Sequence, residues 1–140
     1  MANPILAPAA VLVAWTLVML LWMGVVRFPA LAKLKLGGQD TRGARGSDLD
    51  GVLPSIVQWK SHNYNHLMEQ PTIFYALVAI LALGGWNETD VWLAWAYVIL
   101  RVLHSLWQAM VNTIPVRLTL FTISSFVLLV LAIRALIVTL

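Results

Sequence analysis

Long apolar stretches, separated by short polar segments, run along the whole chain. The first ends its purely apolar part at Arg27, and the second begins at Pro54 and ends at a pair of glycines. A helix of about 20 apolar residues crosses the hydrocarbon core of a bilayer. We expect helices over residues 4–34, 54–84, 90–111 and 115–139. The pattern therefore predicts an all-α, up-down bundle of four transmembrane helices, forming a single domain over residues 1–140.

The composition supports a membrane environment. The chain is 61% hydrophobic and only 11% charged, whereas soluble domains have about 25% charged residues. The absence of cysteine excludes disulfides, thiolate metal sites and a cysteine nucleophile. With so little polar surface, the net charge of +3 does not indicate nucleic-acid binding. We therefore expect lipids, and no nucleic acid, around this protein.

The charges of the loops predict how the chain is oriented. The first loop region is basic and the second is acidic, with Glu88 and Asp90 and no Lys or Arg. Lys and Arg mark the cytoplasmic side of a membrane protein. Loops one and three should therefore face the cytoplasm and both termini should lie outside. The basic residues of the first region are Lys33, Lys35, Arg42 and Arg45.

The polar residues inside the spans gather in one half of the membrane. At about 1.5 Å per helical residue, Glu69 lies roughly 21 Å inward from Leu83 and Arg101 roughly 15 Å inward from Val91. Arg27 and Arg117 lie at the same side, whereas Arg134 lies near the other and should extend its side chain to the headgroups. Two stripes at helical spacing complete the group: His62, Asn65, His66 and Glu69, and Arg101, His104, Ser105 and Gln108.

This half of the membrane has an excess of positive charge. A charge near the membrane centre normally faces the bundle interior and has a partner, so we expect Glu69 to pair with Arg101. Arg27, Lys60, Arg101 and Arg117 against this single acid leave a surplus of three positive charges. Arginine binds carboxylates with two parallel hydrogen bonds, which favours an anionic ligand. The alternative for Arg27, Lys60 and Arg117 is that they only follow the positive-inside rule.

Pro71 interrupts the second span two residues after Glu69. A proline inside a helix leaves the carbonyl four residues earlier, here Leu67, without its hydrogen bond and bends the helix. The bend either serves the site or is a packing kink.

Three motifs resemble those of the membrane-associated proteins in eicosanoid and glutathione metabolism, the MAPEG family. Residues 62–71, His-Asn-Tyr-Asn-His-Leu-Met-Glu-Gln-Pro, resemble its second-helix motif. Residues 101–104 resemble its Arg-x-x-His, and residues 115–117 its Pro-x-Arg at the start of the fourth helix. The resemblance covers essentially the whole chain and is to bacterial-type members, which implies a location in a bacterial inner membrane.

The resemblance implies a homotrimer with glutathione as cosubstrate, bound between adjacent subunits on the cytoplasmic side. Glu69 and Asn65 would hold the ammonium or amide groups of glutathione. Arg27, Arg101 and Arg117 would hold its carboxylates, and Arg117 could instead lie near the thiol, with His104 ordering the site. The expected catalytic residues are Arg117 and His104. The expected ligand-binding residues are Arg27, His62, Asn65, His66, Glu69, Arg101 and Gln108.

The sequence also departs from the family pattern. Gln108 stands where family enzymes often have Tyr, and Leu118 and Phe121 stand where they often have hydroxyls. The helix-two Arg is absent, with Lys60 the nearest base. The first hypothesis is a glutathione transferase or peroxidase acting on lipophilic electrophiles. The second is a non-catalytic trimer that binds an anionic lipid or small anion. A metal site of His62, His66, Glu69 and His104 is a third, disfavoured by the positive surplus.

Overall fold

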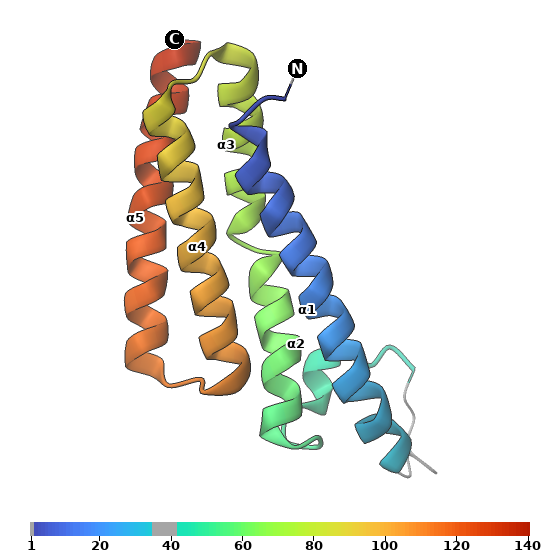
Figure 1. The fold of residues 1–140 in the computed structure, drawn as a ribbon. Coiled ribbons are helices and arrows are strands. Elements are labelled where there is room, and N and C mark those ends of the chain that lie inside the picture. The colour runs from blue at the N-terminus through green and yellow to red at the C-terminus, as the bar shows by residue number, and fades with distance from the viewer. Residues whose placement is uncertain (1, 35–41) are drawn as a thin grey trace.

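The computed structural model of the protein describes residues 2–34 and 42–140, so Lys35 lies outside the described part. In the described part of the chain, four helical segments lie side by side and run alternately up and down, and we call each segment a leg: α1, α2 with α3, α4, and α5 (Figure 1). Both termini lie at one end of the bundle, and the loop between α1 and α2 lies at the other. The all-α bundle predicted from the sequence is confirmed. Its elements are α1 (Leu6–Lys33), a short 3-10 helix η1 (Gly46–Leu49), α2 (Ser55–Leu67), α3 (Pro71–Gly84), α4 (Glu88–Met110) and α5 (Ile114–Thr139).

Three legs are long and apolar enough to cross a membrane, namely α1, the α2–α3 pair and α5. Large apolar side chains such as Leu21, Val25 and Phe28 of α1 point outward, as expected where lipid replaces water. The core lies between the legs and is centred on Phe74 and Tyr97, whose rings stack with centroids 4.5 Å apart. α4 buries five polar side chains inside the bundle, namely Asp90, Arg101, His104, Ser105 and Gln108.

The second leg is broken, whereas the sequence predicted one bent helix over residues 54–84. α2 ends at Leu67 and α3 begins at Pro71, which has no N–H and fits the first turn of a helix. The side chain of Thr72 donates to the carbonyl of Glu69 at 2.6 Å. Gln70, inside the break, donates to Ser125 of α5 at 2.8 Å and accepts from Tyr97 of α4 at 3.1 Å. The break is therefore fixed by hydrogen bonds to two neighbouring helices.

The expectation that Arg134 extends to the headgroups is wrong. Its Nε and Nη2 atoms donate to the two carboxylate oxygens of Asp90 at 2.8 and 3.1 Å. Asp90 also caps α4, because its carboxylate accepts from the backbone N–H of Asn87 at 3.0 Å. Two charge-assisted hydrogen bonds in parallel fix the geometry of this pair. This pair joins the start of α4 to the end of α5.

Candidate functional site

Arg101 is the centre of a polar cluster inside the bundle. Its side chain comes from α4 and is fully buried. Its Nη2 atom lies 2.7 Å from Nδ1 of His66, which comes from the last turn of α2. A guanidinium can only donate, so Nδ1 must accept, and His66 is neutral with its proton on Nε2. The two stripes expected from the sequence therefore meet, and they meet through this pair.

His66 and His104 form the polar wall of a small cavity beside Arg101. Their rings stack with centroids 4.9 Å apart, and the ring of Phe121 meets His66 edge-on at 5.6 Å. The cavity has a volume of about 200 Å³ and is also lined by Arg117 of α5. Asn112 accepts from Nη1 of Arg117 at 2.6 Å, which orients this guanidinium. One guanidinium and two imidazoles, from three helices, thus line one small space.

Arg101 keeps most of its donors unused. Its Nε and Nη1 atoms are buried and have no hydrogen-bond partner among the described residues, and neither has Oε1 of the buried Gln108. Buried polar atoms in proteins are nearly always hydrogen-bonded. The geometry of the guanidinium suits a carboxylate or phosphate, which can accept two parallel bonds. The arrangement is chemically suited to bind an anion.

The expected ion pair between Glu69 and Arg101 does not form. Arg101 is bonded to His66 instead, and the side chains of Glu69 and Asn65 are exposed on the surface of the single chain. The reason is the break after Leu67, since Glu69 lies in the turn and no longer follows the helical stripe. Lys60 also stays apart, because its Nζ donates to the carbonyl of Ile56 and lies over the ring of Trp22.

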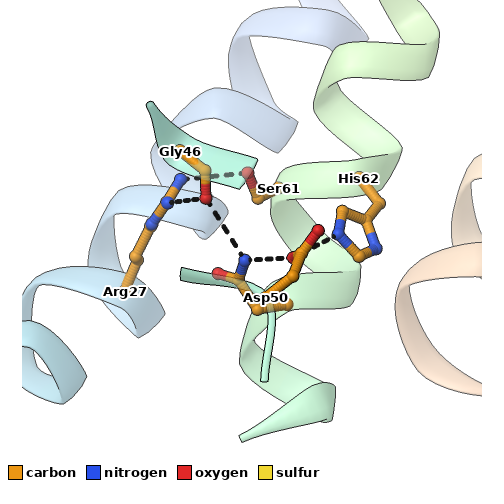
Figure 2. A network of polar contacts seen from close by, with 6 residues as sticks. Arg27, Gly46, Asp50, Ser61 and His62 are labelled. Atoms are coloured by element: carbon orange, nitrogen blue, oxygen red, sulfur yellow. Dashed lines mark hydrogen bonds and ion pairs between the residues drawn. The ribbon is translucent and has the colours of Figure 1, made fainter. Parts of the chain in front are cut away.

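Arg27 belongs to a second group of polar contacts, which we call the loop clasp: Arg27, Gly46, Asp50, Gln58, Ser61 and His62. Nη1 of Arg27 donates to Ser61 at 3.0 Å and Nη2 to the carbonyl of Gly46 at 2.9 Å (Figure 2). A Cβ at Gly46 would lie 3.1 Å from Nη2 of Arg27, so a glycine permits this close approach. The contacts attach the loop to α1 and α2.

His62 also lies in the loop clasp, away from the His66–His104 cavity. Its Nε2 donates to Asp50 at 2.9 Å, and Gln58 donates to the same carboxylate oxygen at 2.6 Å (Figure 2). These hydrogen bonds, with that from Gln58 the larger influence, hold the pKa of Asp50 below its usual value. Asp50, Gln58 and Ser61 were not among the site residues expected from the sequence. The spacing of Gln58, Ser61 and His62 on one helix face was the available signal.

The structure thus brings together His66, Arg101, His104 and Arg117, with Gln108 buried on the same helix as Arg101. It places Arg27 and His62 in the loop clasp, and Asn65 and Glu69 on the surface of the chain. Within residues 2–34 and 42–140, no three His, Asp or Glu side chains are grouped so that they could hold a metal ion.

The model of the MAPEG family matches residues 5–137, which is nearly the entire chain. Neither the curated proteins nor the solved structures contain a significant match.

Proposed function

Because the chain belongs to the MAPEG family, a membrane family of glutathione and eicosanoid metabolism, we propose that it binds glutathione and conjugates it to lipophilic electrophiles. The observation that supports this best is the buried guanidinium of Arg101, with two nitrogen atoms lacking partners in the described chain. Glutathione has two carboxylates and one ammonium and is therefore a net anion. One of its carboxylates would accept from Arg101.

A trimer would complete this site. The cavity at His66, His104 and Arg117 has a volume of about 200 Å³, below the 300–1,000 Å³ typical of ligand pockets. Asn65 and Glu69 are exposed on the single chain and would be available to the part of the ligand that lies between subunits. We therefore place glutathione at the boundary of two copies, with Glu69 near its ammonium group and Asn65 near an amide.

The proposed chemistry needs a stabilised thiolate. Positive charge next to a thiol lowers its pKa and increases the thiolate fraction. Arg117 lines the cavity and would lie nearest the sulfur, while His104, held against His66, would order the site. With an aryl halide as the electrophile, the thiol proton passes to water and the sulfur attacks the carbon that carries the halogen. A carbon–sulfur bond forms, the carbon–halogen bond breaks and halide leaves.

The basic first loop supports the orientation that puts this site on the cytoplasmic side. A bacterial inner membrane is the location that we propose from the resemblance to bacterial-type members. Glutathione would then enter from the cytoplasm, and the electrophile would arrive from the lipid.

A second candidate is binding without catalysis. Leu118 and Phe121 line the cavity at positions where the enzymes of the family often have hydroxyl groups. A trimer that binds an anionic lipid or small anion at the same arginines would need no thiolate.

The test uses detergent-purified protein. Isothermal calorimetry measures glutathione binding, and absorbance follows conjugation to 1-chloro-2,4-dinitrobenzene. Binding with conjugation supports the transferase, whereas binding without conjugation, for this and for peroxide substrates, supports the second candidate. If the protein shows no glutathione binding and no conjugation, the proposal that it is a glutathione transferase is overturned. Lys33→Gln, which removes a basic charge outside both clusters, should behave as the wild type.

A further inference from the structure

Arg101 lies where an anion in the cavity beside it cannot reach it. The described residues that line this cavity of about 200 Å³ include Arg117 but not Arg101. The side chain of Arg101 is fully buried, yet its Nε and Nη1 atoms have no partner in the described chain. A ligand that accepts from these atoms therefore needs a passage that is closed in this structure.

Two rings stand between the cavity and Arg101, since both line the cavity and both lie next to the guanidinium. One is the imidazole of His66, whose Nδ1 accepts from Nη2 of Arg101 at 2.7 Å. The other is the phenyl ring of Phe121, whose centroid lies 6.0 Å from Cζ of Arg101. The two rings meet edge-on with centroids 5.6 Å apart. Together they close the passage.

Of these two rings, that of Phe121 moves at the smaller cost. Rotation of His66 would break a buried hydrogen bond to a charged group. The phenyl ring is half-buried and makes no hydrogen bond, and within the described chain it does not belong to the apolar core. The backbone at Phe121 is held in place, because its carbonyl accepts from the hydroxyls of Ser124 and Ser125 at 2.9 and 2.8 Å. Rotation of the Phe121 side chain about its own bonds is therefore the simplest way to open the passage.

We propose that Phe121 controls access to Arg101 and thereby decides which anions bind there. In the closed position, the electron-rich face of the ring lies near the guanidinium and partly compensates its buried charge. A carboxylate that arrives from the cavity replaces the ring, because charge-assisted hydrogen bonds are stronger than this contact. Only an acceptor on a slender chain fits, since the chain must pass between His66 and the displaced ring. The inference rests on the proposed function, which makes glutathione the ligand.

Control of access has a kinetic signature that differs in sign from the loss of a contact. When the closed ring competes with the ligand, the apparent affinity is reduced by the fraction of molecules in which the ring is open. Removal of the ring then raises the association rate constant and lowers the Kd by the same factor, and the dissociation rate constant hardly changes. A ring that only contacts bound glutathione would have the opposite effect, because its removal would speed dissociation and raise the Kd.

The experiment follows glutathione binding to the detergent-purified full chain by stopped-flow tryptophan fluorescence, with the Kd from calorimetry. We expect Phe121→Ala to raise the association rate constant and to lower the Kd at least about fivefold. Phe121→Trp enlarges the ring and should slow association. Phe126→Ala removes the same ring from an exposed position of α5 and should leave both constants unchanged. If Phe121→Ala lowers the thermal midpoint by more than about 5 °C, Phe121→Leu takes its place.

A second measurement tests the passage without glutathione. Butanedione, a small dicarbonyl compound that modifies arginine side chains, is added to each protein, and the modified peptides are quantified by mass spectrometry. Modification of Arg101 should be at least about tenfold faster in Phe121→Ala than in the wild type. Modification of Arg134, which is bonded to Asp90, is the internal control and should not change.

The two measurements separate this proposal from the proposed function. If no protein binds glutathione but Arg101 is more reactive in Phe121→Ala, the glutathione function is overturned and the control of access by Phe121 is supported. If glutathione binds and Phe121→Ala leaves its association unchanged, or raises the Kd through faster dissociation, the role of Phe121 is overturned and the glutathione function stands. Equal reactivity of Arg101 in the wild type and in Phe121→Ala, or an equal effect of Phe126→Ala, would also overturn that role.

Discussion

The guanidinium of Arg134 binds the carboxylate of Asp90 through two hydrogen bonds, and the carboxylate is completely buried. The two residues are 44 positions apart and join the start of α4 to the last part of α5. These parts of the two helices are at the end of the bundle away from loop one (Figure 1). They fasten α4 to α5, the two helices that supply Arg101, His104 and Arg117. The geometry of the cluster at one end of these helices is thus supported by an ion pair at the other end.

Removing the arginine of this pair should destabilise the protein. Arg134→Leu leaves a buried carboxylate without its ion-pair partner, which is more costly than the loss of the contact alone. We expect the thermal midpoint in detergent to fall by at least about 5 °C, measured by the fluorescence of the tryptophans. Glu88→Gln changes an exposed acid in the same turn of α4 and should shift the midpoint by less than about 1 °C. An equal shift in both variants would contradict the role of the pair.

Replacing Arg101 by lysine should weaken glutathione binding although the charge remains. Lysine presents a point charge and cannot offer two parallel donors to a carboxylate. We expect the Kd for glutathione from calorimetry to rise at least tenfold. Lys60→Arg, which keeps a charge that is directed to Ile56, is the control and should leave the Kd unchanged. Wild-type affinity in Arg101→Lys would place the ligand elsewhere.

A tyrosine at position 108 should increase conjugation if the protein is a transferase. The enzymes of the family often carry Tyr at this position, and a phenol can donate to the thiolate that forms during the reaction. We expect Gln108→Tyr to raise the rate with 1-chloro-2,4-dinitrobenzene severalfold. Gln108→Phe has nearly the same volume but no hydroxyl, and it should give no increase. If Gln108→Phe and Gln108→Tyr raise the conjugation rate equally, the increase comes from packing and not from the hydroxyl group.

The stability of the loop clasp should depend on acid pH. The pKa of Asp50 is lower in the folded protein than its usual value of 3.8, so the unfolded chain binds this proton first as the pH falls. The contribution of Asp50 to stability is thus complete well above pH 4 and is lost as the pH falls through the folded pKa. The difference in thermal midpoint between the wild type and Asp50→Asn should therefore be largest near pH 6 and shrink below pH 4. A difference that stays constant from pH 6 to pH 3 would exclude this ionisation.

Adding a methyl group at Gly46 should loosen the loop. The new Cβ would lie 3.1 Å from Nη2 of Arg27 and would displace the guanidinium from the carbonyl of residue 46. Gly46→Ala should therefore speed tryptic cleavage after Arg42 and Arg45 severalfold, as followed by mass spectrometry. Ser47→Ala alters the next residue without touching Arg27 and should be cleaved at the wild-type rate. Equal rates for all three proteins would show that the clasp does not restrain the loop.

The legs of the bundle and the family were predictable from the sequence, because hydrophobic length and three short motifs are local properties. The meeting of His66, His104 and Arg101 also followed from helical spacing. The ion pairs and hydrogen-bond partners of the charged residues did not follow from helical spacing. Asp90 and Arg134 lie on different helices, so their contact depends on how α4 packs against α5. The sequence predicted a bend at Pro71, but a complete break rotates Glu69 out of the stripe.

Asp50 was missed for a different reason. It lies in a glycine-rich loop that composition describes only as polar, and its position over α2 depends on the 3-10 turn at Gly46–Leu49. Arg27 was expected in the ligand site because its depth is right. The depth of a residue along a helix does not say toward which side of the helix its side chain points, and the side chain of Arg27 points toward the loop.

The break between α2 and α3 gives the molecule one mechanical joint. α2 packs against α1 and α4, whereas α3 packs against α5 and α1, so the two halves of this leg have different neighbours. His66 lies just before the joint and Gln70 lies within it, bonded to α4 and α5. The bond from Arg101 to His66 thus attaches the end of α2 to α4, whereas Gln70 attaches the start of α3 to α4 and α5. A ligand that accepts from the unused Nε and Nη1 atoms of Arg101 would leave both attachments in place, so the anion site can fill without moving either half of this leg.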